Sequence, residues 1–159
     1  MNVDGSFSYS NNAYQHVYVE DASETIAVAS LNTWYQITNA TNDLFNDGIN
    51  KNFTLRGDTL FFDITGVFNA TFNVSFEGSN SDVAEVRMAL FNSSDVLQSS
   101  FKIERGMSSN NTGSAGSCSI GNVTATGYYA LMQVRNTGAS GDITFEQIHF
   151  TIIKIDEAQ

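Results

Sequence analysis

Residues 63–77 read Asp-Ile-Thr-Gly-Val-Phe-Asn-Ala-Thr-Phe-Asn-Val-Ser-Phe-Glu, and this stretch decides the fold. From residue 68 onward, apolar and polar residues alternate without error: Phe68, Ala70, Phe72, Val74 and Phe76 point to one side, and Asn69, Thr71, Asn73, Ser75 and Glu77 point to the other. Strict alternation with a period of two predicts a long β-strand that has one dry face. A strand of this length buries its aromatic row only against a second sheet, so the stretch predicts a β-sandwich.

Similar segments recur along the chain. The pattern predicts further strands over 14–20, 24–30, 34–38, 52–56, 59–64, 84–91, 96–104, 118–124, 128–134 and 143–155. Gly57-Asp58 reads as a two-residue hairpin turn, whereas 39–50 and the Gly- and Ser-rich 106–117 read as loops. We therefore expect an all-β protein, namely a two-sheet antiparallel jelly-roll sandwich of about 8–10 strands with no substantial helix.

Length and charge narrow the range of functions. The 159 residues suit a polar N-terminal arm over 1–13 followed by a single domain over 14–159. A net charge of −10 without any Lys/Arg cluster argues against a nucleic-acid partner and against binding to an anionic membrane. Cys118 is the only cysteine, so no intrachain disulfide forms. The N-terminus does not resemble a signal peptide, and we expect synthesis in a reducing cytoplasm.

The last predicted strand breaks the alternation rule. Ile143 and Phe145 fall on one face, whereas Ile148, Phe150 and Ile152 fall on the other. Two explanations remain open: a β-bulge re-aims the side chains, or both faces are buried. Burial of both faces in a two-layer protein would require another subunit.

No set of residues in the sequence suggests catalysis or metal binding. His16 and His149 each lie in a strand without a neighbouring partner, and Cys118 has no cysteine-protease context. Asp43 and Asp47 lie in a mildly acidic loop, but their spacing fits no defined calcium loop. We expect structural roles for these residues, no enzymatic activity and no cofactor. His149 also raises the hypothesis that subunit association depends on pH.

The sequence contains two candidate binding features, an integrin-type tripeptide and a set of aromatic residues. Arg56-Gly57-Asp58 spells the integrin-binding tripeptide, although Gly-Asp is also what a tight turn requires. Aromatic side chains are candidate contacts for a glycan, and the weak candidates are Trp34, Tyr35, Tyr128 and Tyr129.

Several segments together resemble a known family. They are Asn32-Thr33-Trp34-Tyr35-Gln36-Ile37-Thr38, Thr65-Gly66-Val67-Phe68, Ser75-Phe76-Glu77-Gly78, Gly127-Tyr128-Tyr129 and Phe150-Thr151-Ile152-Ile153-Lys154-Ile155. In this order, over about residues 14–155, they resemble the jelly roll of tumour-necrosis-factor-type and complement-type globular heads, particularly the versions in tailed-phage virion proteins. Phe68 stands where the family usually has tyrosine, and the paired cysteines of secreted animal members are missing, which favours a viral branch.

The resemblance implies a homotrimer whose last strand lies close to the three-fold axis. The neutral outer row of the 63–77 strand also suits a face packed near another polar surface. The interface residues expected on these grounds are Phe145, Ile148, His149, Phe150, Ile152, Asn69, Thr71 and Asn73.

The functional expectation is a non-enzymatic virion structural protein. Specifically, we expect a trimeric decoration or cement protein that is made in the host cytoplasm, binds the major capsid protein and lies on the exterior of a phage head. The alternative is a trimeric receptor-binding or fibre-head module that recognises host surface glycans. A secreted ligand of the tumour-necrosis-factor kind and a jelly-roll hydrolase are less well supported, because the leader, disulfide and clustered catalytic residues are not found in the sequence.

Overall fold

The computed structural model describes residues 12–20, 23–79, 82–107 and 113–158, except for the side chains of 113, 114 and 118–120. The described residues form twelve strands and no helix. The strands are β1 Tyr14–Val19, β2 Glu24–Ile26, β3 Tyr35–Gln36, β4 Asn46–Lys51, β5 Phe53–Arg56, β6 Thr59–Phe62, β7 Gly66–Glu77, β8 Val83–Phe91, β9 Leu97–Gly106, β10 Gly113–Val123, β11 Tyr129–Asn136 and β12 Ile143–Asp156. The all-β antiparallel prediction is confirmed, with more strands than expected. The arm predicted over 1–13 lies almost entirely outside the described residues.

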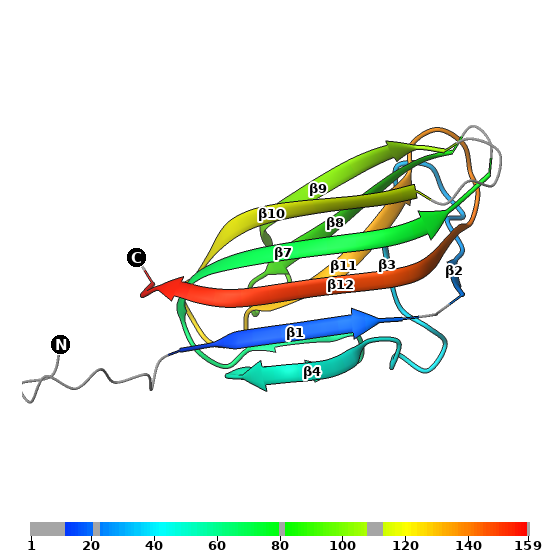
Figure 1. Ribbon diagram of the computed structural model, residues 1–159. Helices are drawn as coiled ribbons and strands as arrows, with labels where there is room; N and C mark the ends of the chain where they lie inside the picture. Colours follow the sequence, from blue (N-terminus) through cyan, green and yellow to red (C-terminus); the bar gives the residue numbers. More distant parts are fainter. Residues whose placement is uncertain (1–11, 21–22, 80–81, 108–112, 159) are drawn as a thin grey trace, which may run out of the picture.

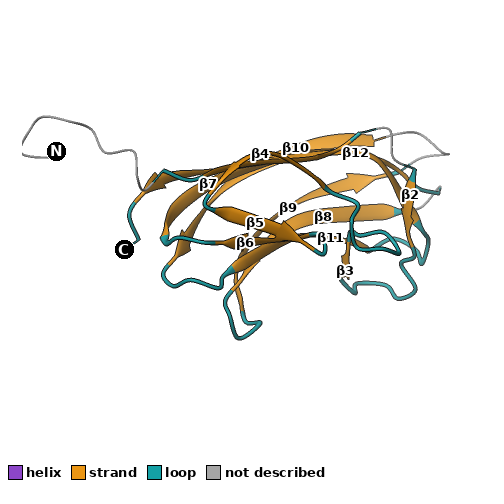
Figure 2. Cartoon of the chain, turned by 90° about the horizontal axis from the view of Figure 1, so that it is seen from below, coloured by secondary structure: helices purple, strands orange, loops and turns teal. Residues whose placement is uncertain are grey.

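The strands form two facing sheets. The first sheet has the order β10-β7-β12-β1-β4, with β2 paired to β12, and lies in front in Figure 1. The second has the order β5-β6-β11-β8-β9, with β3 paired to β11, and Figure 2 shows the two layers from the side. From β7 onward the chain passes repeatedly between the sheets, since β8, β9 and β11 belong to the second sheet and β10 and β12 to the first. This is the connectivity of a jelly roll.

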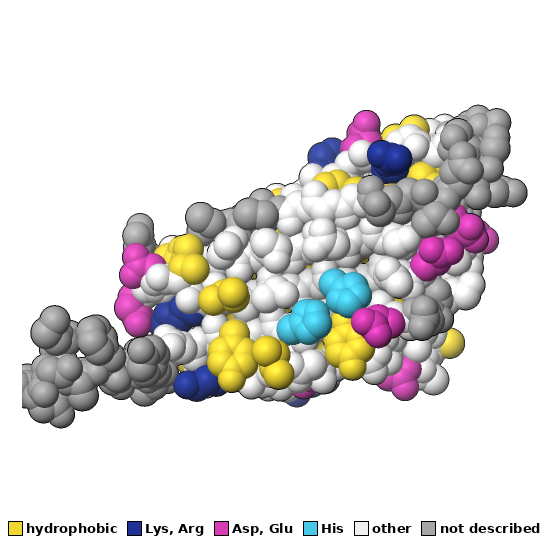
Figure 3. All heavy atoms as spheres, viewed as in Figure 1, with side chains coloured by type: hydrophobic (Ala, Val, Ile, Leu, Met, Phe, Trp, Pro, Cys, Tyr) yellow, Lys and Arg dark blue, Asp and Glu magenta, His cyan; other side chains and the backbone are white. Residues whose placement is uncertain are grey.

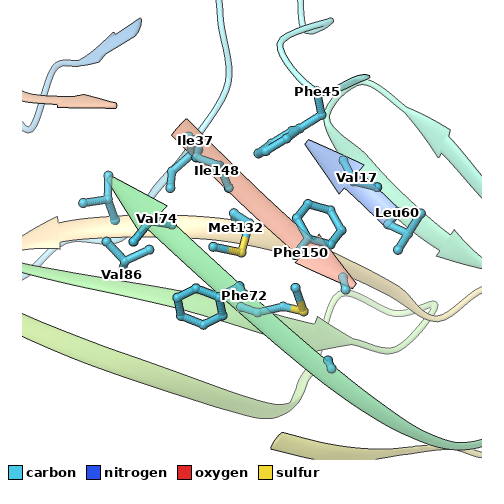
Figure 4. Close-up of a cluster of buried hydrophobic side chains, with 14 of the residues drawn as sticks. Val17, Ile37, Phe45, Leu60, Phe72, Val74, Val86, Met132, Ile148 and Phe150 are labelled. Atoms are coloured by element: carbon cyan, nitrogen blue, oxygen red, sulfur yellow. The ribbon is translucent and has the colours of Figure 1, made fainter. Parts of the chain in front are cut away.

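The strand that predicts the fold behaves as expected. In β7, the apolar residues from Phe68 to Phe76 are buried, while the intervening residues face outward. Figure 4 shows Phe72 and Val74 of this strand in one cluster with Val86 and Met132 of the second sheet. Full burial of an apolar side chain of this size contributes about 1.5–3 kcal/mol to the free energy of unfolding. The aromatic row of β7 therefore stabilises the packing of the two sheets.

A β-bulge explains the irregular pattern of β12. The pairing of β12 with β7 shifts by one residue between Phe145 and Gln147. The extra residue turns the following side chains over, so Ile148, Phe150 and Ile152 join Ile143 and Phe145 in the core of the same chain. The explanation that required a second subunit to bury both faces is therefore wrong for these residues.

Two predicted loops contain strands. Residues 46–51 form β4, an edge strand that pairs with β1, although all its side chains except that of Lys51 are exposed. Residues 113–123 form β10, which pairs with β7 along eleven consecutive residues. In β10, a Cβ at Gly116 would lie 2.3 Å from Oδ1 of Asn73, so a larger residue at this position would require the Asn73 side chain to move. Backbone pairing, rather than apolar side chains, makes these segments strands.

Candidate functional site

The outer face of the first sheet is a candidate contact surface. Three cross-strand rows run over β7, β12 and β1: Asn69–Ile153–Tyr14, Thr71–Thr151–His16 and Asn73–His149–Tyr18. We call these nine residues the polar sheet face. None of the nine residues is Lys, Arg, Asp or Glu. The side chains of Tyr14 and Ile153 are 40% and 48% exposed. An uncharged face with exposed apolar side chains is typical of the centre of a protein interface.

Three rings stack across the second and third rows of the polar sheet face. The ring centroid of His16 lies 5.6 Å from that of Tyr18 and 5.7 Å from that of His149, and all three rings are nearly parallel. Nε2 of His149 lies 3.8 Å from Oε1 of Glu20. Figure 3 shows the two histidines next to each other on this face, with charged side chains gathered mainly toward its margins. The stack forms because β1 and β12 pair antiparallel, which brings residues 16, 18 and 149 together.

The structure divides the expected interface residues into two groups. His149, Asn69, Thr71 and Asn73 lie on the polar sheet face, and the last three face outward as the alternation predicts. Their contact with another subunit stays a prediction. Phe145, Ile148, Phe150 and Ile152 are at most 5% exposed and pack in the core of their own chain. These four side chains therefore cannot contact another subunit without unfolding the sandwich.

The outer face of the second sheet carries a charged cluster that the sequence analysis missed. Trp34, Glu85, Arg87, Lys102 and Arg135 form it, and we call it the arginine–tryptophan cluster. The guanidinium carbons of Arg87 and Arg135 lie 4.1 and 4.6 Å from the centroid of the indole ring. Both Lys102 and Arg135 form ion pairs with Glu85. Alternation in β8 and β11 was the available signal, because it points Glu85, Arg87 and Arg135 outward.

The charges within the cluster do not balance. Burial alone would raise the pKa of Glu85, but hydrogen bonds from Arg135 and Lys102 outweigh it and lower that pKa below 4.5. Burial, followed by the neighbouring charge of Arg135, lowers the pKa of Arg87, and Glu85 offsets part of this effect. Nε of Arg87 donates a hydrogen bond of 2.8 Å to the neutral Oε1 of Gln133. Within the cluster itself, one carboxylate thus faces three cations, and a second carboxylate, that of Glu104, lies opposite Glu85 on the neighbouring strand β9.

Replacing Glu85 by glutamine tests this electrostatic arrangement. We expect a loss of about 2 kcal/mol in the free energy of unfolding at pH 7, because the buried carboxylate accepts bonds from two cations. A lowered folded-state pKa means that the contribution is complete above pH 4.5 and is lost as the pH falls through the folded value. Urea unfolding of the wild type and the variant between pH 7 and pH 3 should therefore show that the difference between their free energies of unfolding decreases in acid. A difference in free energy of unfolding that does not change with pH would contradict this account.

The four candidate glycan residues do not share one surface. Trp34 and Tyr129 lie on the outer side of the second sheet, and Tyr129 stacks on Phe91 at 5.3 Å. Tyr128 is buried, with its hydroxyl 3.0 Å from that of Thr124. Tyr35 packs against the core and accepts a hydrogen bond from the backbone of residue 30. Only Trp34 and Tyr129 are placed to meet a ligand on this face.

The Arg56-Gly57-Asp58 motif forms the predicted hairpin turn between β5 and β6, with φ of +59° at Gly57 and +54° at Asp58. Asp58 is only 4% exposed. Its carboxylate accepts hydrogen bonds from the Thr38 hydroxyl at 2.6 Å and from the backbone N–H groups of Leu44 and Phe45 at 3.1 and 2.8 Å. The aspartate thus anchors the preceding loop, and it is not presented to an integrin.

Asp58→Gly should destabilise the protein strongly. Glycine tolerates the positive φ, so the variant removes the three hydrogen bonds without adding backbone strain. We expect a loss of about 2–4 kcal/mol in the free energy of unfolding, because two buried N–H groups lose their acceptor. Asp63→Gly is the control, since Asp63 is exposed and, among the described residues, its carboxylate accepts a hydrogen bond from the Thr54 hydroxyl alone. Equal melting temperatures for both variants would contradict the anchoring role.

Within the described part of the chain, no group of three or more His, Cys, Asp or Glu residues is placed to hold a metal ion. Asp43 accepts hydrogen bonds from Thr41 and Asn39, which lower its pKa, and Asp47 accepts bonds from Gln15 and Asn50. Cys118 pairs through its backbone with Thr71, but its side chain lies outside the described residues, so its structural role stays a prediction. Among the described residues there is also no helix with the length and apolarity needed to cross a membrane.

Comparisons with known proteins identify the fold. No family model and no curated protein sequence matches the chain. Among solved structures, the globular domain of zebrafish complement 1qA has a TM-score of 0.64 at 11% identity, covering 92% of this chain and 99% of that one. Eiger TNF from S. frugiperda has a TM-score of 0.61 at 15% identity, covering 93% and 95% of the two chains. The PRD1 vertex protein P5 has a TM-score of 0.53 at 16% identity, covering 91% and 97%. The chain has the jelly-roll fold of tumour-necrosis-factor-type and complement-type heads, a fold also found in this virion protein.

Proposed function

We propose that the chain is a non-enzymatic structural protein of a virion surface, which assembles as a homotrimer through the polar sheet face. The observation that carries the proposal is the face itself: three rows without Lys, Arg, Asp or Glu, with stacked rings across two of the rows and with exposed Tyr14 and Ile153. The fold shared with globular heads and with a phage vertex protein supports it.

Three copies around one axis would bury the polar sheet face of each copy. In a three-fold ring each subunit presents two different surfaces, one to each neighbour, so different parts of the polar sheet face would contact the two neighbouring copies. Neutral Asn and Thr side chains keep the desolvation cost low, because no charge is removed from water. The outer face of the second sheet would then point away from the axis and remain available to another partner.

On a virion, such a trimer would act as a cement. It would bridge neighbouring capsid subunits and stabilise their joints by adding contact area, since binding to the assembled state alone shifts the equilibrium toward assembly. Bridging needs an interface on the order of 1,000 Å² or more with the capsid. The major capsid protein is the proposed partner.

Capsid binding is tested by mixing the purified chain with capsids that lack it and sedimenting them. We expect saturable co-sedimentation, and a copy number in purified virions close to that of the capsid subunits. A copy number that matches only the vertices or the tail would replace the cement role with a fibre or vertex role. No binding to capsids and no copies in virions would contradict both roles.

Assembly should respond to pH through the two stacked histidines. Histidine changes its charge between about pH 5 and pH 8, and double protonation would place two positive charges side by side in the buried face. Three side chains surround the histidine pair: Tyr18 of β1, Glu20 directly after β1, and the neutral Asn73 of β7. We expect the trimer to weaken at pH 5, as measured by light scattering, and His149→Gln to reduce that effect. An assembly of constant mass from pH 5 to pH 8 would refute this prediction.

A receptor-binding head is the second candidate function, and one observation favours it. The outer face of the second sheet carries half-buried Trp34 and Tyr129 together with clustered cations. Exposed aromatic side chains next to charged groups are common in recognition surfaces. This candidate is compatible with the same trimer.

A further inference from the structure

We propose that the arginine–tryptophan cluster binds the carboxylate of an acidic saccharide, with Arg87 as the principal contact. The proposal rests on the receptor-binding candidate rather than on the cement role. It names a ligand class and a binding site on the sheet opposite the polar sheet face.

Arg87 lacks an anionic partner within the part of the chain that the structure describes. Among the residues that the structure describes, no carboxylate lies within 4.0 Å of the Arg87 guanidinium, and the only hydrogen bond that this group makes is to Gln133. Glu85 is already shared by Lys102 and Arg135. A half-buried guanidinium without an anionic partner is a site for an incoming anion, because the planar fork matches a carboxylate.

The side chains of the cluster are preorganised. The indole of Trp34 lies against both guanidinium groups, and Gln133 holds Nε of Arg87. β8 and β11 pair over eight residues and fix the backbone under both arginines. A ligand therefore meets cations whose side-chain freedom is already restricted, which reduces the entropy lost on binding.

Location and total charge favour a saccharide over a peptide or a nucleic acid. The cluster lies on a sheet face where β8 pairs with both β9 and β11, so an extended peptide cannot join the sheet there as a strand. A chain of net charge −10 repels a polyanion such as nucleic acid, whereas a single carboxylate meets only the local cations. Sugar rings also present apolar C–H faces, and Trp34 supplies an aromatic surface within the cluster itself.

Trp34 is the only tryptophan, so its fluorescence reports directly on the site. We would titrate the protein with N-acetylneuraminic acid and glucuronic acid, and with neutral N-acetylglucosamine, at constant ionic strength. The expected result is a saturable fluorescence change with the acidic sugars alone, and weaker binding at high salt. No change, or the same change with the neutral sugar, would overturn the proposal.

Arg87→Gln should weaken binding at least about tenfold, since it removes the guanidinium fork. Arg56→Gln is the matched control, because Arg56 lies over Phe61 on the same sheet but outside the cluster. Lys102→Ala should weaken binding severalfold. Because Lys102 is half exposed, this variant should fold normally, and it therefore tests the site even if Arg87→Gln folds poorly. Equal affinities for all variants would contradict the assignment.

A polyglutamate peptide is the last ligand to compare. Tighter binding of polyglutamate than of the acidic sugars would overturn the saccharide assignment and indicate a protein partner. Binding to host cells without binding to acidic sugars would overturn this site while leaving the receptor-binding candidate in place.

Discussion

Asn136→Ala should lower the free energy of unfolding by about 3–5 kcal/mol, one of the largest effects expected of any single polar substitution in this chain. Asn136 is fully buried at the end of β11. Its Oδ1 accepts hydrogen bonds from the backbone N–H groups of residues 83, 138 and 139, at 3.2, 3.1 and 3.2 Å. Its Nδ2 donates to Oδ1 of Asp82, also buried, at 2.7 Å. Alanine would leave all these groups without their partner.

The control for this prediction is Asn92→Ala. Asn92 also accepts hydrogen bonds from two backbone N–H groups, those of residues 94 and 96, but it lies at a partly exposed hairpin where water can replace it. We expect a loss of about 1 kcal/mol there. Urea unfolding measures both changes, and similar losses for the two variants would show that burial of the Asn136 network contributes little.

Thr71→Arg should convert the assembled protein into monomers. Thr71 lies at the centre of β7, in the middle row of the polar sheet face beside Thr151. An arginine there would bring one unpaired charge per subunit into a buried interface, a cost of several kcal/mol for each charge. The side chain points away from the core of its own chain, so the sandwich should unfold at nearly the same urea concentration as a wild-type monomer.

Thr54→Arg on β5 is the matched control for Thr71→Arg. Thr54 is an exposed strand threonine on the second sheet, away from the polar sheet face. Light scattering should give a mass reduced to one third for Thr71→Arg and an unchanged mass for Thr54→Arg. If Thr71→Arg stays assembled, the polar sheet face is not the interface.

Sequence patterns predict the parts of this fold that side-chain burial determines. The alternation in β7 correctly predicts which side chains from Phe68 to Glu77 are buried and which face outward. Gly57-Asp58 correctly predicts the hairpin between β5 and β6. β4 and the first half of β10 were read as loops, because backbone pairing with β1 and β7 defines them and produces no periodic pattern of apolar residues. The second half of β10 falls in the strand predicted over 118–124. The β12 bulge was one of two open explanations, since the residue pattern alone does not separate a bulge from a second buried face.

The candidate surfaces were only partly predictable for a related reason. Asn69, Thr71 and Asn73 were found because they share one strand. The arginine–tryptophan cluster combines β8, β9 and β11 with residue 34, and only the strand order brings these distant segments together. Asp58 was recognised as a turn residue, but its hydrogen bonds to residues 38, 44 and 45 depend on where the preceding loop packs.

Self-association through the polar sheet face is the central claim, and the mass of the purified protein in solution tests it most directly. Sedimentation equilibrium at micromolar concentration and pH 8 should give three times the chain mass of 17.3 kDa. A mass of 17.3 kDa across the micromolar range would contradict the claim.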